Sequence, residues 1–308
     1  MSVVVVGSIA FDSIKTPFGE RTKSLGGAAN YFSVAAQYFT QVHMVGVIGE
    51  DYPKSHLIYL KNRGVDISGV EVVAKASFHW QGEYGYDLNE AKTIATELNA
   101  FETFKPSLAC HATMADCVFL ANIDPELQIH VLQQMKAPKI RALDSMNFWI
   151  EKKPDLLQKA ISMVDILFIN EAEIRALSDE YNIVKAAKRV QKMGARIVVV
   201  KRGEYGSLLF FDNQMAFMPA FPTEEVFDPT GAGDTFAAGF LGYIDGCKRL
   251  DMPALRQAMV MGSVMASFVI EQFSFDRLMN LSKEAIWERV CLLQGLLSNN
   301  EIAQPIWG

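Results

Sequence analysis

The chain has 308 residues, of which 50% are hydrophobic and 21% are charged. This composition is that of a folded globular protein, and it excludes disordered, collagen-like and low-complexity chains. The 29 Lys and Arg residues against 35 Asp and Glu residues give a net charge of −6. Because no overall positive field exists, we expect neither nucleic acid nor an anionic membrane surface as a partner.

The apolar runs are too short for a membrane span. Runs such as 3–6 and 197–200 fall far below the ~20 residues that a spanning helix needs. Residues 1–10 carry no positive leader and precede Asp12, which argues against a secretory signal. The four cysteines show no Cys-x-x-Cys spacing, and the five histidines form no paired metal pattern near them. We therefore predict a reduced, cytoplasmic protein without such a metal site.

Short runs rich in β-branched residues recur along the chain, as is typical of strands buried on both faces of a parallel sheet. Helical patterns lie between them. One covers 183–193, with Val184, Ala187 and Val190 in one stripe and Gly194 at the position of a C-terminal cap. The alternation predicts an α/β fold with a doubly wound, mostly parallel sheet flanked by helices. The predicted strands are 3–6, 42–48, 117–120, 140–143, 166–169 and 197–200.

Two segments, at about 12–25 and 71–105, interrupt this alternation. In the second, Phe78, Trp80, Tyr84 and Tyr86 occupy even positions, so an extended chain would place four aromatic side chains on one face. That face could pack against the core or a second subunit, or cover a substrate pocket. No repeat or linker divides the chain. We expect one domain over 1–308 that carries a small β-strand lid.

The residues from Asp228 to Asp234 give the strongest chemical signal. Gly231 and Gly233 stand where a helix over about 234–244 begins, so backbone N–H groups can converge there on an anion. An acid at Asp234 would repel a bound phosphate. The Asp234 carboxylate suits phosphoryl transfer instead. There it would take the proton of an attacking hydroxyl while the N–H groups stabilise the transferring phosphoryl group. The alternative is an ordinary turn and helix cap.

Two other nucleotide-binding signatures are missing from the sequence. No Gly-Lys dipeptide occurs, which excludes a P-loop. No Gly-x-Gly-x-x-Gly follows the first predicted strand, so a dinucleotide-binding fold has little support.

The chain closely resembles the PfkB, or ribokinase-like, family of carbohydrate kinases over nearly its whole length. Four elements in the family's order carry this resemblance: Gly26-Gly27-Ala28-Ala29-Asn30, Asn170-Glu171-Ala172-Glu173, Lys201 to Gly206, and Asp228 to Phe240. The resemblance implies transfer of the γ-phosphoryl group of ATP, with Mg²⁺, to a hydroxyl of a sugar-like substrate.

The resemblance also implies roles for single residues. Asp234 matches the catalytic base, and the backbone of Gly231, Ala232 and Gly233 matches the anion hole. Asp12 matches the aspartate that holds substrate hydroxyls, and Gly26, Gly27 and Asn30 fall on the substrate-facing loop. A carboxylate and an amide together can accept from and donate to a diol. Capping of a turn or helix is the alternative for Asp12 and Asn30.

The family resemblance also implies which residues bind the nucleotide and the metal ions. Glu173 would orient water around Mg²⁺, since this ion keeps much of its hydration; a capping box is the alternative. Lys201 would meet a phosphate, unless it is only a solvated residue at a strand end. Asp228 matches a position near which some relatives bind a potassium-like ion, although the neighbouring Pro229 departs from the family's pattern. The expected nucleotide contacts are Asn170, Lys201, Gly203 and Gly206, with Gly262, Ser263 and Ala266 around the adenine.

The charge of the second lid segment bears on the substrate. Over 71–105 six acids oppose three lysines, which disfavours a substrate that already carries phosphate. Lys15, Arg21 and Lys23 of the first lid segment could compensate in space. We predict a neutral sugar, with a nucleoside as the alternative, because aromatic rings stack on either.

Other classes of function are a catalytically idle sugar- or nucleotide-binding protein, which ATP turnover would exclude, and a nicotinamide-dependent oxidoreductase, which a cofactor titration would test. The exposed lid strands also suggest a homodimer joined through the lid.

Overall fold

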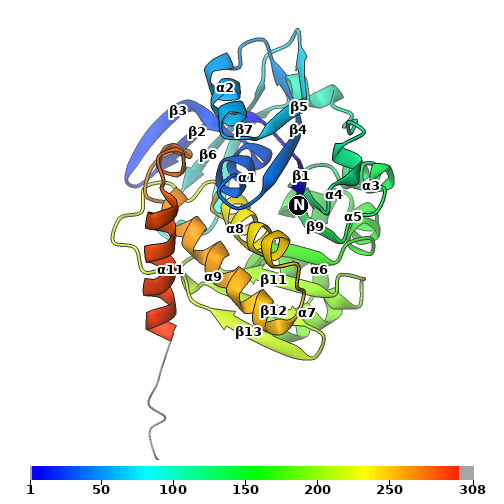
Figure 1. The fold of residues 1–308 in the computed structure, drawn as a ribbon, viewed down its shortest axis with the longest axis vertical. Helices are drawn as coiled ribbons and strands as arrows, with labels where there is room; N and C mark the ends of the chain where they lie inside the picture. The colour runs from blue at the N-terminus through cyan, green and yellow to red at the C-terminus, as the bar shows by residue number, and fades with distance from the viewer. Residues whose placement is uncertain (1, 298–308) are drawn as a thin grey trace, which may run out of the picture.

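The computed structural model describes residues 2–297, and its strands form two sheets (Figure 1). The large sheet is parallel except at its last two pairs, β11–β12 and β12–β13, which confirms the predicted α/β fold. From edge to edge it contains β13 (Gln214–Met218), β12 (Ser207–Phe211), β11 (Ile197–Lys201), β10 (Ile166–Asn170), β9 (Ile140–Asp144), β8 (Cys117–Leu120), β1 (Ser2–Val6), β4 (Gln41–Gly49) and β5 (Asp66–Val73).

Helices cover both faces of this sheet, and successive strand residues enter two separate cores. Val3 and Val5 of β1 belong to one core, whereas Val4 and Val6 belong to the other. The first core is covered by α1 (Ala28–Ala36), α8 (Ala232–Cys247), α9 (Met252–Val269) and α11 (Lys283–Leu297), the second by α3 (Pro125–Gln134), α5 (Pro154–Ile161), α6 (Glu171–Ser178) and α7 (Ile183–Gln191). The remaining helices are α2 (Lys54–Asn62), α4 (Asn147–Lys152), α10 (Asp276–Met279) and the 3₁₀ turns η1 (Asn99–Thr103), η2 (Ala112–Met114) and η3 (Gly203–Tyr205).

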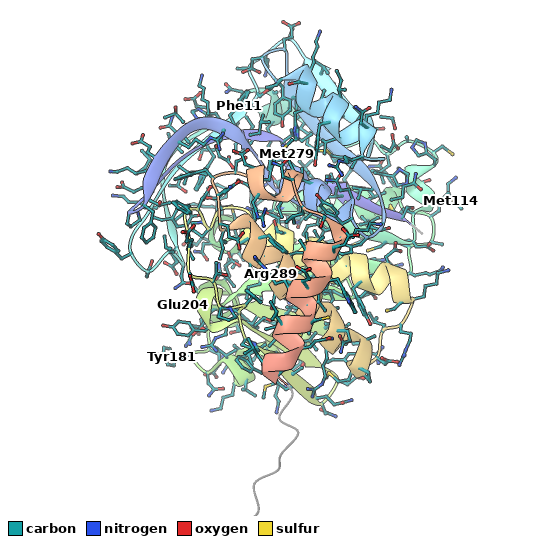
Figure 2. All side chains as sticks on the ribbon, turned by 60° about the vertical axis from the view of Figure 1, so that its left-hand side comes forward. Phe11, Met114, Tyr181, Glu204, Met279 and Arg289 are labelled. Atoms are coloured by element: carbon teal, nitrogen blue, oxygen red, sulfur yellow. The ribbon has the colours of Figure 1, made fainter. Side chains whose placement is uncertain are left out.

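Helix α11 packs along α9 at the side of the molecule. Ile286, Val290 and Leu293 enter the core, and the Arg289 guanidinium lies 3.6 Å from the centre of the Phe268 ring (Figure 2). A cation over an aromatic face adds to the apolar contact. Within residues 2–297, no helix is both long and apolar enough to cross a bilayer.

All six predicted strands are confirmed, and the predicted stripe of the 183–193 helix is right for Ala187 and Val190 but wrong for Val184. Val184 is 40% exposed, and the buried residues of α7 are Ala186, Ala187 and Val190. With Ile183 these form the i, i+3, i+4, i+7 pattern of one helix face, from which Val184 is offset. The helix also ends earlier, at Gln191.

The second sheet is formed by the two segments expected to make a lid, and it lies beside α1 and α2 in Figure 1. Its strand order is β3 (Gly19–Gly26), β2 (Ala10–Thr16), β6 (Phe78–Tyr84) and β7 (Ala91–Glu97). Residues 71–73, included in the predicted lid, complete β5 of the large sheet instead. The predicted four-aromatic face is wrong at its end, because β6 stops at Tyr84 and Tyr86 is 87% exposed.

Candidate active site

Three neighbouring parallel strands end in polar residues at the same edge of the large sheet. Asp144 ends β9, Asn170 ends β10 and Lys201 ends β11. This carboxyl edge is where open α/β sheets bind ligands. The Lys201 ammonium donates to Asp144 Oδ2 over 2.5 Å. Lys201 is therefore not a solvated residue at a strand end, and that alternative is wrong.

The glycine turn opens helix α8 beside this edge. Gly231 adopts a left-handed backbone with φ 76° as the N-cap, and the helix begins at Ala232, two residues before the predicted start. The Ala232 N–H donates to the Pro229 carbonyl over 3.1 Å. Among the described residues, Gly231 and Gly233 have no backbone acceptor for their N–H groups. These two N–H groups are free to meet an anion.

Lys201 also lies directly over the glycine turn. A β-carbon placed on Gly233 would fall 2.8 Å from Lys201 Nζ, so a larger side chain would displace the ammonium. A β-carbon on Gly231 would fall 2.2 Å from the Tyr31 ring. The turn thus combines free N–H groups, a helix N-terminus and one side-chain cation, which together favour a phosphate.

Asp234 occupies the first turn of α8 and is half-buried. Burial and the charge of Asp144 raise its pKa to about 7, although Lys201 acts in the opposite direction. A carboxyl group with a pKa near neutrality can both accept and return a proton under physiological conditions.

Asp12 of β2 lies close enough to Asp228 and Asp234 for their charges to act on it. Burial and the charge of Asp228 raise the pKa of Asp12 to about 7, the N–H of Gly27 opposes this, and the charge of Asp234 raises it further. A β-carbon on Gly26 would fall 1.9 Å from Asp12 Oδ2, so a larger side chain there would displace the Asp12 carboxylate. The structure therefore brings Asp12, Gly26 and Gly27 together within the electrostatic reach of Asp234.

The Asn30 side chain lies behind this loop and has no exposed surface. Its amide nitrogen donates to the Gly26 carbonyl and to the Tyr52 hydroxyl, and its Oδ1 is 2.8 Å from His56 Nε2. Burial lowers the pKa of His56 to about 4, so a neutral His56 donates this bond. In this conformation Asn30 supports the substrate-facing loop, and contact with a substrate would require these bonds to rearrange.

Asn170 and Glu173 form the capping box that was the alternative interpretation. Asn170 Oδ1 accepts from the Glu173 N–H and Glu173 Oε2 accepts from the Asn170 N–H, both over 2.8 Å. Burial and the charge of Asp144 raise the pKa of Glu173 to about 7, against the effect of Lys201. The capping box thus holds a buried carboxylate next to Asp144.

The donor set suits a magnesium ion. The charge of Asp144 acts on both Glu173 and Asp234, and the Lys201 ammonium opposes its effect on each of them. Oxygen ligands and retained water are what Mg²⁺ prefers. Three carboxylates against one ammonium would gain from a divalent cation, and a bound Mg²⁺ would neutralise phosphate charge here.

Asp228 is fully buried and shapes the loop before the glycine turn. Its Oδ1 accepts from the Thr230 N–H over 2.9 Å and its Oδ2 from the Ser274 N–H over 3.1 Å. Both carboxylate oxygens are therefore engaged within the protein.

The residues expected around the nucleotide lie on two elements. Gly203 begins η3 and Gly206 follows it, with φ values of 54° and 79°, which favour glycine. A β-carbon on Gly262 would fall 2.9 Å from the Phe236 carbonyl, so this glycine allows α9 to pack against α8. Ser263 is also buried, whereas Ala266 is partly exposed.

Sequence reasoning missed several residues of the site. Asp144 could have been found, because it ends a predicted strand as Asn170 and Lys201 do. Tyr31 lies among the acids of the site, and its hydroxyl is buried without a partner among the described residues. The lid adds Tyr84, whose hydroxyl accepts a hydrogen bond from Thr230 Oγ1 over 3.2 Å. These contacts depend on the tertiary fold, which sequence spacing does not reveal.

The tip of the lid hairpin reaches the nucleotide side. A β-carbon on Gly203 would fall 1.8 Å from Asn89 Oδ1, and the charge of Glu90 acts on Glu173. The β6–β7 hairpin therefore contacts both the glycine-turn loop, through Tyr84, and the loop after β11, through Asn89.

The site combines a carboxylate of raised pKa, free helix N–H groups and a lysine over the same turn, which are the groups that transfer of a phosphoryl group to a hydroxyl needs. Comparison with known proteins agrees. Residues 2–277 match the pfkB family carbohydrate kinase. The cytidine kinase of Thermococcus kodakarensis is 32% identical over 271 residues, which cover 84% of this chain and 96% of that protein. The chain belongs to the pfkB family of carbohydrate kinases, and the resemblance seen in its motifs is confirmed.

Solved structures agree on the fold. The nucleoside kinase of Methanocaldococcus jannaschii superposes with a TM-score of 0.75 at 22% identity, covering 94% of this chain and 98% of that one. The Burkholderia thailandensis nucleoside kinase in complex with ADP-inosine gives 0.77 at 18% identity, with 95% and 96% covered. The protein is an ATP-dependent kinase for a sugar or nucleoside hydroxyl, and its family implies ATP and a divalent metal. The oxidoreductase alternative is wrong.

Proposed function

We propose that this kinase phosphorylates a neutral nucleoside. The observation that supports a neutral acceptor is the pairing of Lys15 and Arg21, two of the three cations of the first lid segment. Lys15 pairs with Glu83 of the lid itself over 2.8 Å, and Arg21 pairs with Asp276 of α10. These cations are engaged elsewhere, and the acceptor side is dominated by Asp12, Asp228 and Asp234. A substrate phosphate would be repelled there.

Support for a nucleoside over a free sugar comes from relatives. The relative with 32% identity is named a cytidine kinase, and a second, 25% identical over 271 residues, is the nucleoside kinase of Methanothermobacter thermautotrophicus. Aromatic rings of the site suit a base as well as a sugar face. A free sugar, which the sequence favoured, is the second candidate. The charges of the lid disfavour a phosphorylated substrate, but they do not distinguish a free sugar from a nucleoside.

In the proposed reaction Asp12 accepts hydrogen bonds from the sugar hydroxyls and Asp234 takes the proton of the attacking hydroxyl. The N–H groups of Gly231 and Gly233 stabilise the negative charge of the transferring phosphoryl group, and Lys201 lies over the same turn. Asp144, Asn170 and Glu173 would hold the hydrated Mg²⁺.

Four further assignments belong to this proposal. Gly203, Gly206, Gly262, Ser263 and Ala266 would border the nucleotide. Potassium dependence near Asp228 is tested by replacing potassium with choline in the assay. A homodimer through the lid is tested by light scattering of the purified protein. A cytoplasmic location is tested by cell fractionation.

The decisive experiment measures phosphorylated product with Mg²⁺ and ATP against nucleosides, free sugars and sugar phosphates. We expect the highest kcat/KM for a nucleoside and little turnover of any sugar phosphate. The Asp234→Asn variant serves as the control for contaminating kinases. A free sugar turned over better than every nucleoside would replace the proposed substrate class, and preference for a sugar phosphate would refute the neutral acceptor.

A further inference from the structure

A cluster outside the active site joins two histidines to one carboxylate. His43 Nδ1 lies 2.9 Å from Asp66 Oδ2, and His111 Nε2 lies 2.6 Å from the same oxygen. The three ligand atoms are all within 4.8 Å of one another. The residues stand 23 and 45 positions from Asp66 in the chain, so the histidine spacing in the sequence gave no sign of this cluster.

We propose that His43, Asp66 and His111 form a binding site for a divalent transition metal ion of the zinc type. Two imidazoles and one carboxylate are ligands that zinc commonly takes, with water in the fourth position of a tetrahedron. Ligands at about 2.0–2.1 Å in that geometry lie roughly 3.3 Å apart, so small side-chain movements suffice.

The surroundings favour an ion at this place. His43 is buried in β4, whereas the His111 side chain is 55% exposed and provides access from solvent. The other oxygen of Asp66 accepts from the Ser68 N–H over 2.9 Å, which orients the carboxylate. A neutral histidine carries one ring N–H, so metal binding at the nitrogen that faces Asp66 requires that proton to lie on the other ring nitrogen.

The position defines what the ion would do. Asp66 begins β5, the edge strand of the large sheet, His43 lies near the start of β4, and His111 precedes β8. The cluster is thus at the amino ends of the strands, opposite the carboxyl edge that carries the active site. A bound ion would join the edge strand to the segment before β8 and stabilise the fold without taking part in catalysis.

The test titrates Co²⁺ into the chelator-treated full chain in excess Mg²⁺, which occupies the acidic active site. We expect one Co²⁺ per chain with the visible absorption of a tetrahedral site. His111→Ala should abolish this absorption and weaken binding by more than the roughly 10–100-fold that loss of a supporting residue costs. The control is His130→Ala, which changes an exposed histidine of α3.

A second measurement shows whether the His111→Ala variant is still folded. Zn²⁺ should raise the Tm of the wild type and of His130→Ala but not of His111→Ala, and all three should retain kinase activity. Identical Co²⁺ titrations of the wild type and His111→Ala would overturn the proposal, as would an absorption that disappears in Asp234→Asn instead. Neither outcome touches the proposed substrate.

Discussion

Asp234 is held where its own burial disfavours the charged form, and this makes it suited to proton transfer. Asp234→Asn keeps the shape and the helix N-terminus but removes the base. We expect kcat to fall by about 10²–10⁴-fold with little change in ATP affinity. Kinetics and a nucleotide titration measure the two quantities. The matched control is Asp212→Asn, an exposed acid paired with Arg196. Wild-type rates in Asp234→Asn would remove this residue from the mechanism.

The raised pKa of Asp234 predicts a pH dependence. Only the ionised carboxylate accepts a proton, so kcat/KM should rise as the pH increases through about 7. A pH profile between 5.5 and 8.5 checks this. The residual activity of Asp234→Asn should lack the same inflection, and a flat wild-type profile would contradict the assigned base.

At the scale of elements, the glycine turn and the end of β11 act together. Gly233→Ala should push the Lys201 ammonium away, and a shift of about 1 Å can reduce a rate by roughly 100-fold. We expect such a loss in kcat without unfolding. Gly246→Ala in the same helix is the control, because its β-carbon meets nothing within 4 Å. That control should gain roughly 0.5–1 kcal/mol of stability, measured by urea unfolding.

Some features of these elements could be predicted from the sequence and others could not. The buried strands were predictable, because residues such as Ile197 to Val200 are apolar on both faces. The family resemblance pointed to Asp12, Gly26 and Asp234, which the structure places close together. The support of Asn30 by His56 was not predictable, since it depends on α2 packing against the loop. Nor was the contact of Asn89 with Gly203, which depends on how the lid hairpin folds over the sheet.

For the whole molecule, the buried acids imply a stability that depends on pH. The pKa values of Asp12, Glu173 and Asp234 are each raised to about 7 in the folded state. Such groups contribute most to the free energy of unfolding below their ordinary pKa near 4, and this contribution is lost as the pH rises through about 7. We expect the ligand-free protein to have a lower free energy of unfolding at pH 8 than at pH 5.5.

Urea unfolding at both pH values tests this. Asp234→Asn should be about 1–2 kcal/mol more stable than the wild type at pH 8 and closer to it at pH 5.5, because the amide carries no charge to bury. If Asp234→Asn is no more stable than the wild type at pH 8, burial of the charged Asp234 carboxylate does not destabilise the fold as inferred.

The lid hairpin touches Thr230 through Tyr84 and Gly203 through Asn89, so one element would contact both ligands. Thermodynamic linkage then requires reciprocity: if a non-hydrolysable ATP analogue tightens acceptor binding by some factor, the acceptor must tighten analogue binding by the same factor. Calorimetric titrations in both orders measure it, and Asn89→Ala should bring the factor towards one. Equal affinities with and without the other ligand would mean that the two halves of the site bind independently.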